Sequence, residues 1–163
     1  MEKKTMRKAR RTTLFVLMAL LVLSISTSAL PALACDDCYS KTGCTPGYWK
    51  QEQHFDSWVA TGYSPGDLVG DVFPVAPAEL AGDSLLDALK YKGGPGELGA
   101  ARILLRSSVA AVLNAAHPDV SYRAKVGWLI ENVNLRLDYG NRGKMLELYE
   151  KLDYWNNFGC PLN

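Results

Sequence analysis

Several residue patterns are missing from this chain of 163 residues, and their absence narrows its function. The chain contains no Gly-x-Ser-x-Gly elbow and no His-Glu-x-x-His helix, which are two common hydrolase signatures. It has no alternating run of β-branched residues that would predict a sheet. Lys and Arg cluster only near the start, so we expect no nucleic-acid partner. No repeat or low-complexity linker divides the chain, which favours one domain.

The first 34 residues are typical of a signal peptide. Basic residues as far as Arg11 precede an apolar run, Leu14–Ile25, that is short for a membrane span. Ala32-Leu33-Ala34 matches the Ala-x-Ala cleavage signal, so we expect a secreted or cell-surface protein. Two alternatives stay open: an uncleaved membrane anchor through residues 14–34, or lipidation at Cys35. Contact with a membrane is expected only in those two cases.

Cleavage after Ala34 would change the charge balance of the chain. It would leave 12 basic and 16 acidic residues, so the mature protein would be mildly acidic. We expect a short segment over 35–43, followed by a single helical domain over 44–163.

All four cysteines lie beyond the predicted signal peptide, and an even number in an exported chain points to disulfides. Four cysteines allow three pairings. We favour Cys44 with Cys160, because both lie in similar Gly-Cys-x-Pro or Gly-Cys-Pro settings, and Cys35 with Cys38, because that pair is local.

A metal site is the competing hypothesis for the cysteines. Zinc accepts ligands of these types at short spacings, and the set would be Cys35, Cys38 and Cys44 with His54 or Cys160. An oxidising compartment favours disulfides over this site, so no metal and no other cofactor is the preferred expectation.

Helical periodicity predicts an all-α fold, a small disulfide-stapled bundle of about four main helices with a loop rich in Gly and Pro. The loop covers 61–77, with one helical turn at 67–72. Expected N-caps are Thr45, Asp83 or Ser84, Ser121 and Asn141. The four main helices are expected at 85–91, 97–116, 122–138 and 142–156, after a short one over 46–54.

Three aromatic residues near the first helix form a possible binding face: Tyr48, Trp49 and Trp58. Large aromatic side chains close to a disulfide in a small domain are more often part of the core, which is the favoured interpretation. The Asn114 side chain could form hydrogen bonds to a buried backbone group or a partner helix, or it could bind a ligand. The structural role is the favoured interpretation.

Three motifs together resemble a family of exported bacterial and archaeal domains. They are Gly-Cys-Thr-Pro-Gly-Tyr-Trp-Lys at 43–50, Leu-Asn-Ala-Ala-His-Pro at 113–118 and Asn-Asn-Phe-Gly-Cys-Pro at 156–161. The resemblance implies a secreted or cell-surface domain, supports the pairing of Cys44 with Cys160, and carries over no catalytic residue. Relatives often continue the first motif with Asn-His, whereas Gln51-Glu52-Gln53 stands before His54 here.

These patterns leave three functional hypotheses. The leading one is an exported non-catalytic domain for surface attachment, assembly or ligand binding, with an unidentified protein or carbohydrate partner at the cell surface. The second is an exported hydrolase, and the third is the metal-binding domain. Candidate residues for a hydrolase are His54 and His117 with Asp56, Asp119 or Glu131, and Ser57, Ser64 or Ser121 as nucleophile.

Overall fold

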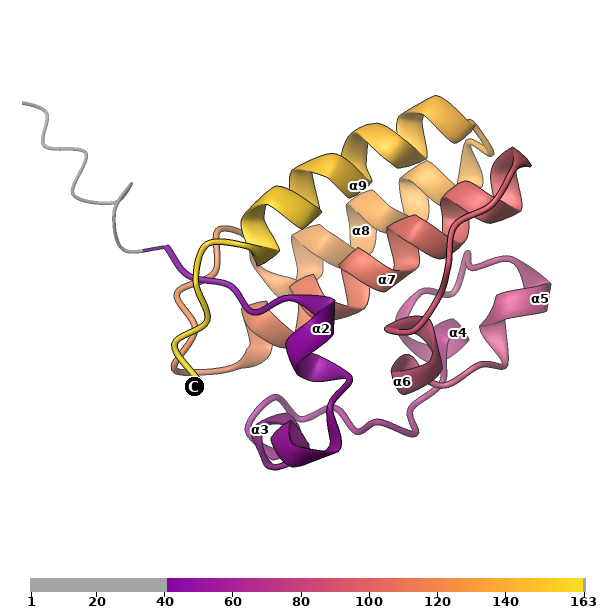
Figure 1. Cartoon of the computed structure of the whole chain (residues 1–163). Helices are drawn as coiled ribbons and strands as arrows, with labels where there is room; N and C mark the ends of the chain where they lie inside the picture. The colour runs from indigo at the N-terminus through magenta and orange to yellow at the C-terminus, as the bar shows by residue number, and fades with distance from the viewer. Residues whose placement is uncertain (1–40, 163) are drawn as a thin grey trace, which may run out of the picture. The chain divides into compact units, whose positions relative to one another are not determined.

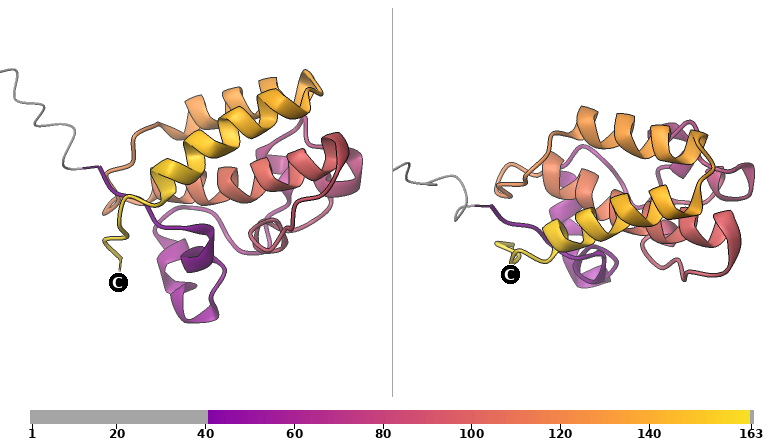
Figure 2. Two further views of the ribbon diagram at one scale, coloured as in Figure 1. Left: turned by 45° about the horizontal axis from the view of Figure 1, so that its top comes forward. Right: turned by 90° about the horizontal axis from the view of Figure 1, so that it is seen from above.

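Three long helices form the main body of the domain in the computed structural model, which describes residues 41–162 (Figure 1). These are α7 (Gly96–Ala116), α8 (Val126–Asp138) and α9 (Arg142–Asn156). α7 packs against both of the others, and α8 also contacts α9. The views in Figure 2 show the three helices side by side. The predicted all-α, disulfide-stapled fold is confirmed for this part of the chain.

Shorter helices cover another side of α7. In Figure 1 they lie below α7, whereas α8 and α9 lie above it. α2 and α6 contact α7 directly. The short helices are α2 (Pro46–Trp49), the 3₁₀ helix η1 (Glu52–His54), α3 (Asp56–Val59), α4 (Val69–Val72), α5 (Ala78–Ala81) and α6 (Leu85–Ala88).

Part of the sequence lies outside the described residues. The predicted signal peptide over 1–34 belongs to it, as do Cys35 and Cys38.

α7 is the central helix because it is apolar on most of its surface. Thirteen of its 21 residues are buried, including Leu104, Leu105 and Leu113. It ends at Ala116, and His117 takes an extended conformation because the residue before a proline avoids the helical region. α7 is long and apolar enough to cross a bilayer, but 72% of its most apolar window is buried inside this domain.

α8 begins later than its sequence predicts. The expected helix starts at Tyr122 with Ser121 as its N-cap, but α8 starts at Val126 and has no side-chain cap. Two contacts hold the preceding segment outside the helix. Thr42 exchanges hydrogen bonds with the backbone of Ser121, and the Tyr122 hydroxyl reaches Asn156 in the core.

The short helix expected over 46–54 is divided into α2 and η1, because the backbone of Gln51 is extended. The other helix boundaries agree better with the sequence. The side chains of Thr45, Ser84 and Asn141 cap α2, α6 and α9 as predicted. α6 is shorter than the expected 85–91, because Lys90 and Tyr91 bond to carbonyls three residues back and form turns. Gly140 follows α8 with φ at +58°, a conformation that glycine adopts without strain.

The core joins the long helices to the short ones. Its largest side chains with less than 2% exposure include Trp49, Trp58 and Phe73 from the first half and Leu104, Leu113, Leu129 and Leu152 from the long helices. The first motif is therefore packed against the bundle and forms part of it.

Candidate functional site

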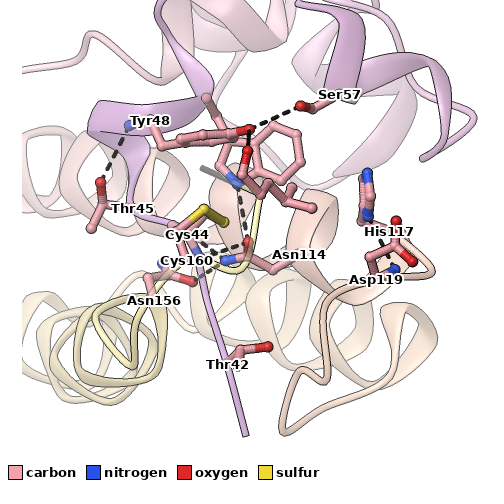
Figure 3. Close-up of a disulfide and its surroundings, with 12 residues drawn as sticks. Thr42, Cys44, Thr45, Tyr48, Ser57, Asn114, His117, Asp119, Asn156 and Cys160 are labelled. Carbon is pink, nitrogen blue, oxygen red and sulfur yellow. Dashed lines mark hydrogen bonds between the residues drawn. A yellow bond between two sulfur atoms is a disulfide. The ribbon is translucent and has the colours of Figure 1, made fainter. Parts of the chain in front are cut away.

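The disulfide between Cys44 and Cys160 joins the two ends of the described domain (Figure 3). The two Cα atoms are 4.4 Å apart although the residues are 116 positions apart in sequence. The favoured pairing of these two cysteines is confirmed. Disulfides persist in oxidising compartments, so this bond indicates that the domain matures in one. In the chain-entropy account, closing a loop of this length stabilises the fold by roughly 4 to 5 kcal/mol.

Two glycines allow the chain ends to approach each other beside the disulfide. Gly43 and Gly159 form an isolated antiparallel bridge, in which the Gly43 N–H donates to the Gly159 carbonyl at 3.1 Å. A Cβ atom at Gly43 would collide with the carbonyl oxygen of Trp155. Gly159 has φ at +91°, which side chains disfavour. Both glycines therefore have structural reasons to precede the two cysteines.

Asn114 fixes the first cysteine to α7. Its side-chain oxygen accepts hydrogen bonds from the Cys44 N–H at 2.9 Å and from the Trp49 indole at 3.1 Å. Its amide nitrogen donates to the Cys44 carbonyl at 2.8 Å and to Asn156 at 3.0 Å. All four hydrogen-bonding positions of this fully buried amide are used. The favoured interpretation of Asn114 as a structural residue agrees with these contacts.

Asn156 extends this network from α9. Its oxygen accepts a second hydrogen bond from the Tyr122 hydroxyl at 2.8 Å, and its nitrogen donates to the Ser107 carbonyl at 3.0 Å. Burial raises the pKa of the Tyr122 hydroxyl, which stays protonated and serves as a donor. The network thus connects α2, α7, α9 and the segment before α8.

The three aromatic residues of the possible binding face are buried. Trp49 is 0% and Trp58 is 1% exposed, and the Trp58 indole donates to the Trp49 carbonyl at 3.0 Å. The Tyr48 hydroxyl contacts Ser57 and donates to the Leu162 carbonyl. The binding-face interpretation is wrong for these rings, because packing against the disulfide and α7 removes them from the surface. The alternative interpretation as core residues is correct.

Both histidines are engaged by groups other than carboxylates. His54 stacks on the Tyr48 ring with centroids 4.0 Å apart, and its Nε2 lies 3.3 Å from the Gln53 amide. His117 is buried, and its Nδ1 accepts the backbone N–H of Asp119 at 3.2 Å. Between residues 41 and 162, neither imidazole hydrogen-bonds a carboxylate or a serine hydroxyl.

The candidate serine nucleophiles also have other partners. Ser57 contacts the Tyr48 hydroxyl, and the Ser64 hydroxyl donates to Asp67 at 2.7 Å. The backbone of Ser121 pairs with Thr42. Within residues 41–162, the structure therefore shows no hydrogen bond that joins a candidate histidine to a candidate serine hydroxyl or carboxylate.

The hypothetical zinc set loses at least one of its four ligands. The Cys44 sulfur is bonded to Cys160 and cannot serve as a thiolate. The His54 ring is stacked on the Tyr48 ring. No group of three or more candidate metal ligands occurs within the described residues 41–162.

A cleft of about 600 Å³ opens on the surface beside the disulfide. Its walls come from the start of α2, the segment that follows α6, α7 and α9. We call it the cationic cleft, after the side chains that line it together with Tyr149 and Asp153: Lys50, Lys90, Lys92 and Arg106. No sequence pattern indicates this site, because its residues come from four separate segments. Within the motif at 43–50, Lys50 could have pointed to the site, because it is the one exposed residue of that motif.

No protein family, curated protein or solved structure matches the chain. The resemblance in the three motifs thus stays a prediction.

Proposed function

We propose that this chain is an exported, non-catalytic helical domain that binds a ligand at the cell surface. The observation that carries the proposal is the placement of the cationic cleft next to a disulfide-fixed framework. Such a placement holds binding groups on rigid elements, which reduces the loss of conformational freedom when a ligand binds.

The key residues of the three motifs have structural roles. Cys44, Cys160, Asn114 and Asn156 are committed to the disulfide or to a hydrogen-bond network in the core. The cationic cleft is a surface on which a ligand can be recognised without using these residues. Export is supported by the signal-like first 34 residues and by the disulfide, which needs an oxidising compartment.

Binding to washed cell envelopes of the producing organism tests this function. The purified, disulfide-bonded protein is added at increasing concentration, and the bound fraction is measured after sedimentation. We expect saturable binding with no release of soluble fragments from the envelopes. Release of sugar or peptide fragments would instead identify a hydrolase, and an absence of saturable binding would contradict the proposed role.

A further inference from the structure

The cationic cleft concentrates positive charge on an otherwise acidic domain. Residues 41–162 carry 12 Lys or Arg and 14 Asp or Glu. Four of these cations line the cleft, and Asp153 is its single carboxylate. A cleft lined mainly by one sign of charge focuses the electrostatic field and attracts ligands of the opposite sign. The ligand of this cleft should therefore be an anion.

Most of these cations are free to contact a ligand. Within the described part of the chain, Lys50 and Lys92 form no ion pair, and both are exposed. Lys90 lies 3.9 Å from Asp87 in an exposed pair, a type that contributes little stability. The Arg106 guanidinium makes one long hydrogen bond, 3.4 Å to the Tyr91 carbonyl, and its other N–H groups are available.

Asp153 and Tyr149 narrow the chemistry of the anion. Asp153 forms no ion pair within residues 41–162, so its carboxylate is available to accept hydrogen bonds from hydroxyl groups. The same negative charge disfavours a ligand as densely charged as a phosphate chain. Tyr149 is half-buried in the cleft wall and adds an aromatic ring with a hydroxyl group. A ligand that fits this cleft should therefore carry both hydroxyl groups and carboxylates that are spaced apart. Acidic sugars carry both kinds of group.

We propose that the cationic cleft binds a carboxylate-bearing polysaccharide of the uronate type. Lys50, Lys92 and Arg106 contact the carboxylates of the sugar chain, and Asp153 accepts hydrogen bonds from its hydroxyls. The volume of about 600 Å³ lies within the range typical of small-ligand sites, so the cleft holds a short stretch of the polymer. This inference rests on the proposed binding function and names its ligand class.

Isothermal titration calorimetry with three probes tests the ligand class. The probes are an oligogalacturonate, its neutral methyl ester and a polyphosphate of similar charge, each added to the disulfide-bonded protein at low salt. We expect the oligogalacturonate to bind more tightly than the other two. Equal binding of the methyl ester, or tighter binding of the polyphosphate, would overturn the assignment, as would no binding of the oligogalacturonate.

Charge-reversal variants test the site. Lys50→Glu combined with Lys92→Glu should weaken oligogalacturonate binding by at least about tenfold. Lys125→Glu combined with Lys144→Glu changes the net charge equally outside the cleft and should weaken binding less than about twofold. Equal losses in both pairs would show that net charge alone controls binding and would overturn the site. Thermal unfolding of each variant confirms that all four substitutions leave the fold intact.

Asp153→Asn separates the two kinds of anion further. Removing its negative charge relieves the repulsion of both anions, but only the oligogalacturonate loses hydroxyl hydrogen bonds to the carboxylate, which accepts them more strongly than an amide. The variant should therefore strengthen polyphosphate binding more than oligogalacturonate binding. An equal gain in the binding of both probes would contradict the role of Asp153. Mass spectrometry of the recovered probe tests the proposed function separately, since shortened oligogalacturonate would mean catalysis even if the cleft is the site.

Discussion

Asn114 on α7 donates a hydrogen bond from its side-chain amide to the side-chain oxygen of Asn156 on α9, 3.0 Å away. Both residues are fully buried, and they are 42 positions apart in sequence. This pair connects the motif around Cys44 to the motif that ends in Cys160. It explains why three separate motifs of the sequence act as one structural unit.

Replacing Asn114 with alanine should destabilise the domain strongly. The change leaves the Cys44 N–H and carbonyl and the Trp49 indole without their buried partner. Each of these three unsatisfied groups costs about 1 to 3 kcal/mol, so we expect a loss of at least about 3 kcal/mol. Urea denaturation with the disulfide intact measures this loss. Asn132→Ala is the matched control, since the Asn132 amide bonds within α8 at the surface, and a similar loss in both variants would contradict the network's role.

Removing the long disulfide should also destabilise the domain. The double variant Cys44→Ala with Cys160→Ala should lose roughly 4 to 5 kcal/mol in unfolding free energy according to the chain-entropy account. Denaturation curves of the variant and the oxidised wild-type protein measure the difference. Cys35→Ser with Cys38→Ser serves as the comparison, and a larger loss in this second pair would show that the main constraint lies there.

Two glycines should respond to alanine in opposite directions. Gly43→Ala places a Cβ atom against the Trp155 carbonyl oxygen, so the two chain ends must separate, and we expect a loss of about 2 kcal/mol or more. Gly127→Ala adds a methyl group to α8 with no neighbour within 4 Å and should stabilise by about 0.5 to 1 kcal/mol. Thermal unfolding compares them, and a neutral Gly43→Ala would mean that the bridge to Gly159 is not required.

Tyr122 should make stability depend on alkaline pH. Burial raises the pKa of its hydroxyl above the unfolded value of about 10, so the folded state retains a proton that the unfolded state loses. The stability of the wild-type protein should therefore fall as pH rises above about 10. Tyr122→Phe should cost about 1 kcal/mol at pH 7, because the hydrogen bond to Asn156 is lost.

The stability of wild-type protein relative to Tyr122→Phe should fall by about 1.4 kcal/mol between pH 7 and pH 11, so that the variant becomes slightly the more stable of the two at pH 11, since it has no phenol at this position. Unfolding free energies at the two pH values provide the measurement. Tyr154→Phe is the control, because Tyr154 is 64% exposed. A constant difference across this range would contradict the burial of the Tyr122 hydroxyl.

Local signals in the sequence predicted those parts of the fold that depend on neighbouring residues. The caps at Thr45, Ser84 and Asn141 and the end of α7 before Pro118 were all identified correctly. Each of these depends on a contact or a conformational restriction within a few positions. The cysteine pairing was also correct, because the two Gly-Cys motifs share a local pattern.

Features that depend on distant residues were not predicted. The start of α8 moves to Val126 because Tyr122 contacts Asn156, 34 positions later. The partnership of Asn114 with Asn156 spans 42 positions, and no periodic pattern indicates it. The cationic cleft was missed for the same reason, because its cations come from the residue after α2, from α7 and from the segment between α6 and α7. Such sites appear only after the helices have packed.

Non-reducing peptide mapping of the protein recovered from outside the cell tests the central claim most directly. A protease digest analysed by mass spectrometry should contain one species that joins the peptide of Cys44 to the peptide of Cys160. That result would show that the domain matures in an oxidising compartment. It would also show that the disulfide beside the cationic cleft is formed in the exported protein. Finding Cys44 joined to Cys35 or Cys38, or finding all four thiols free, would contradict the account.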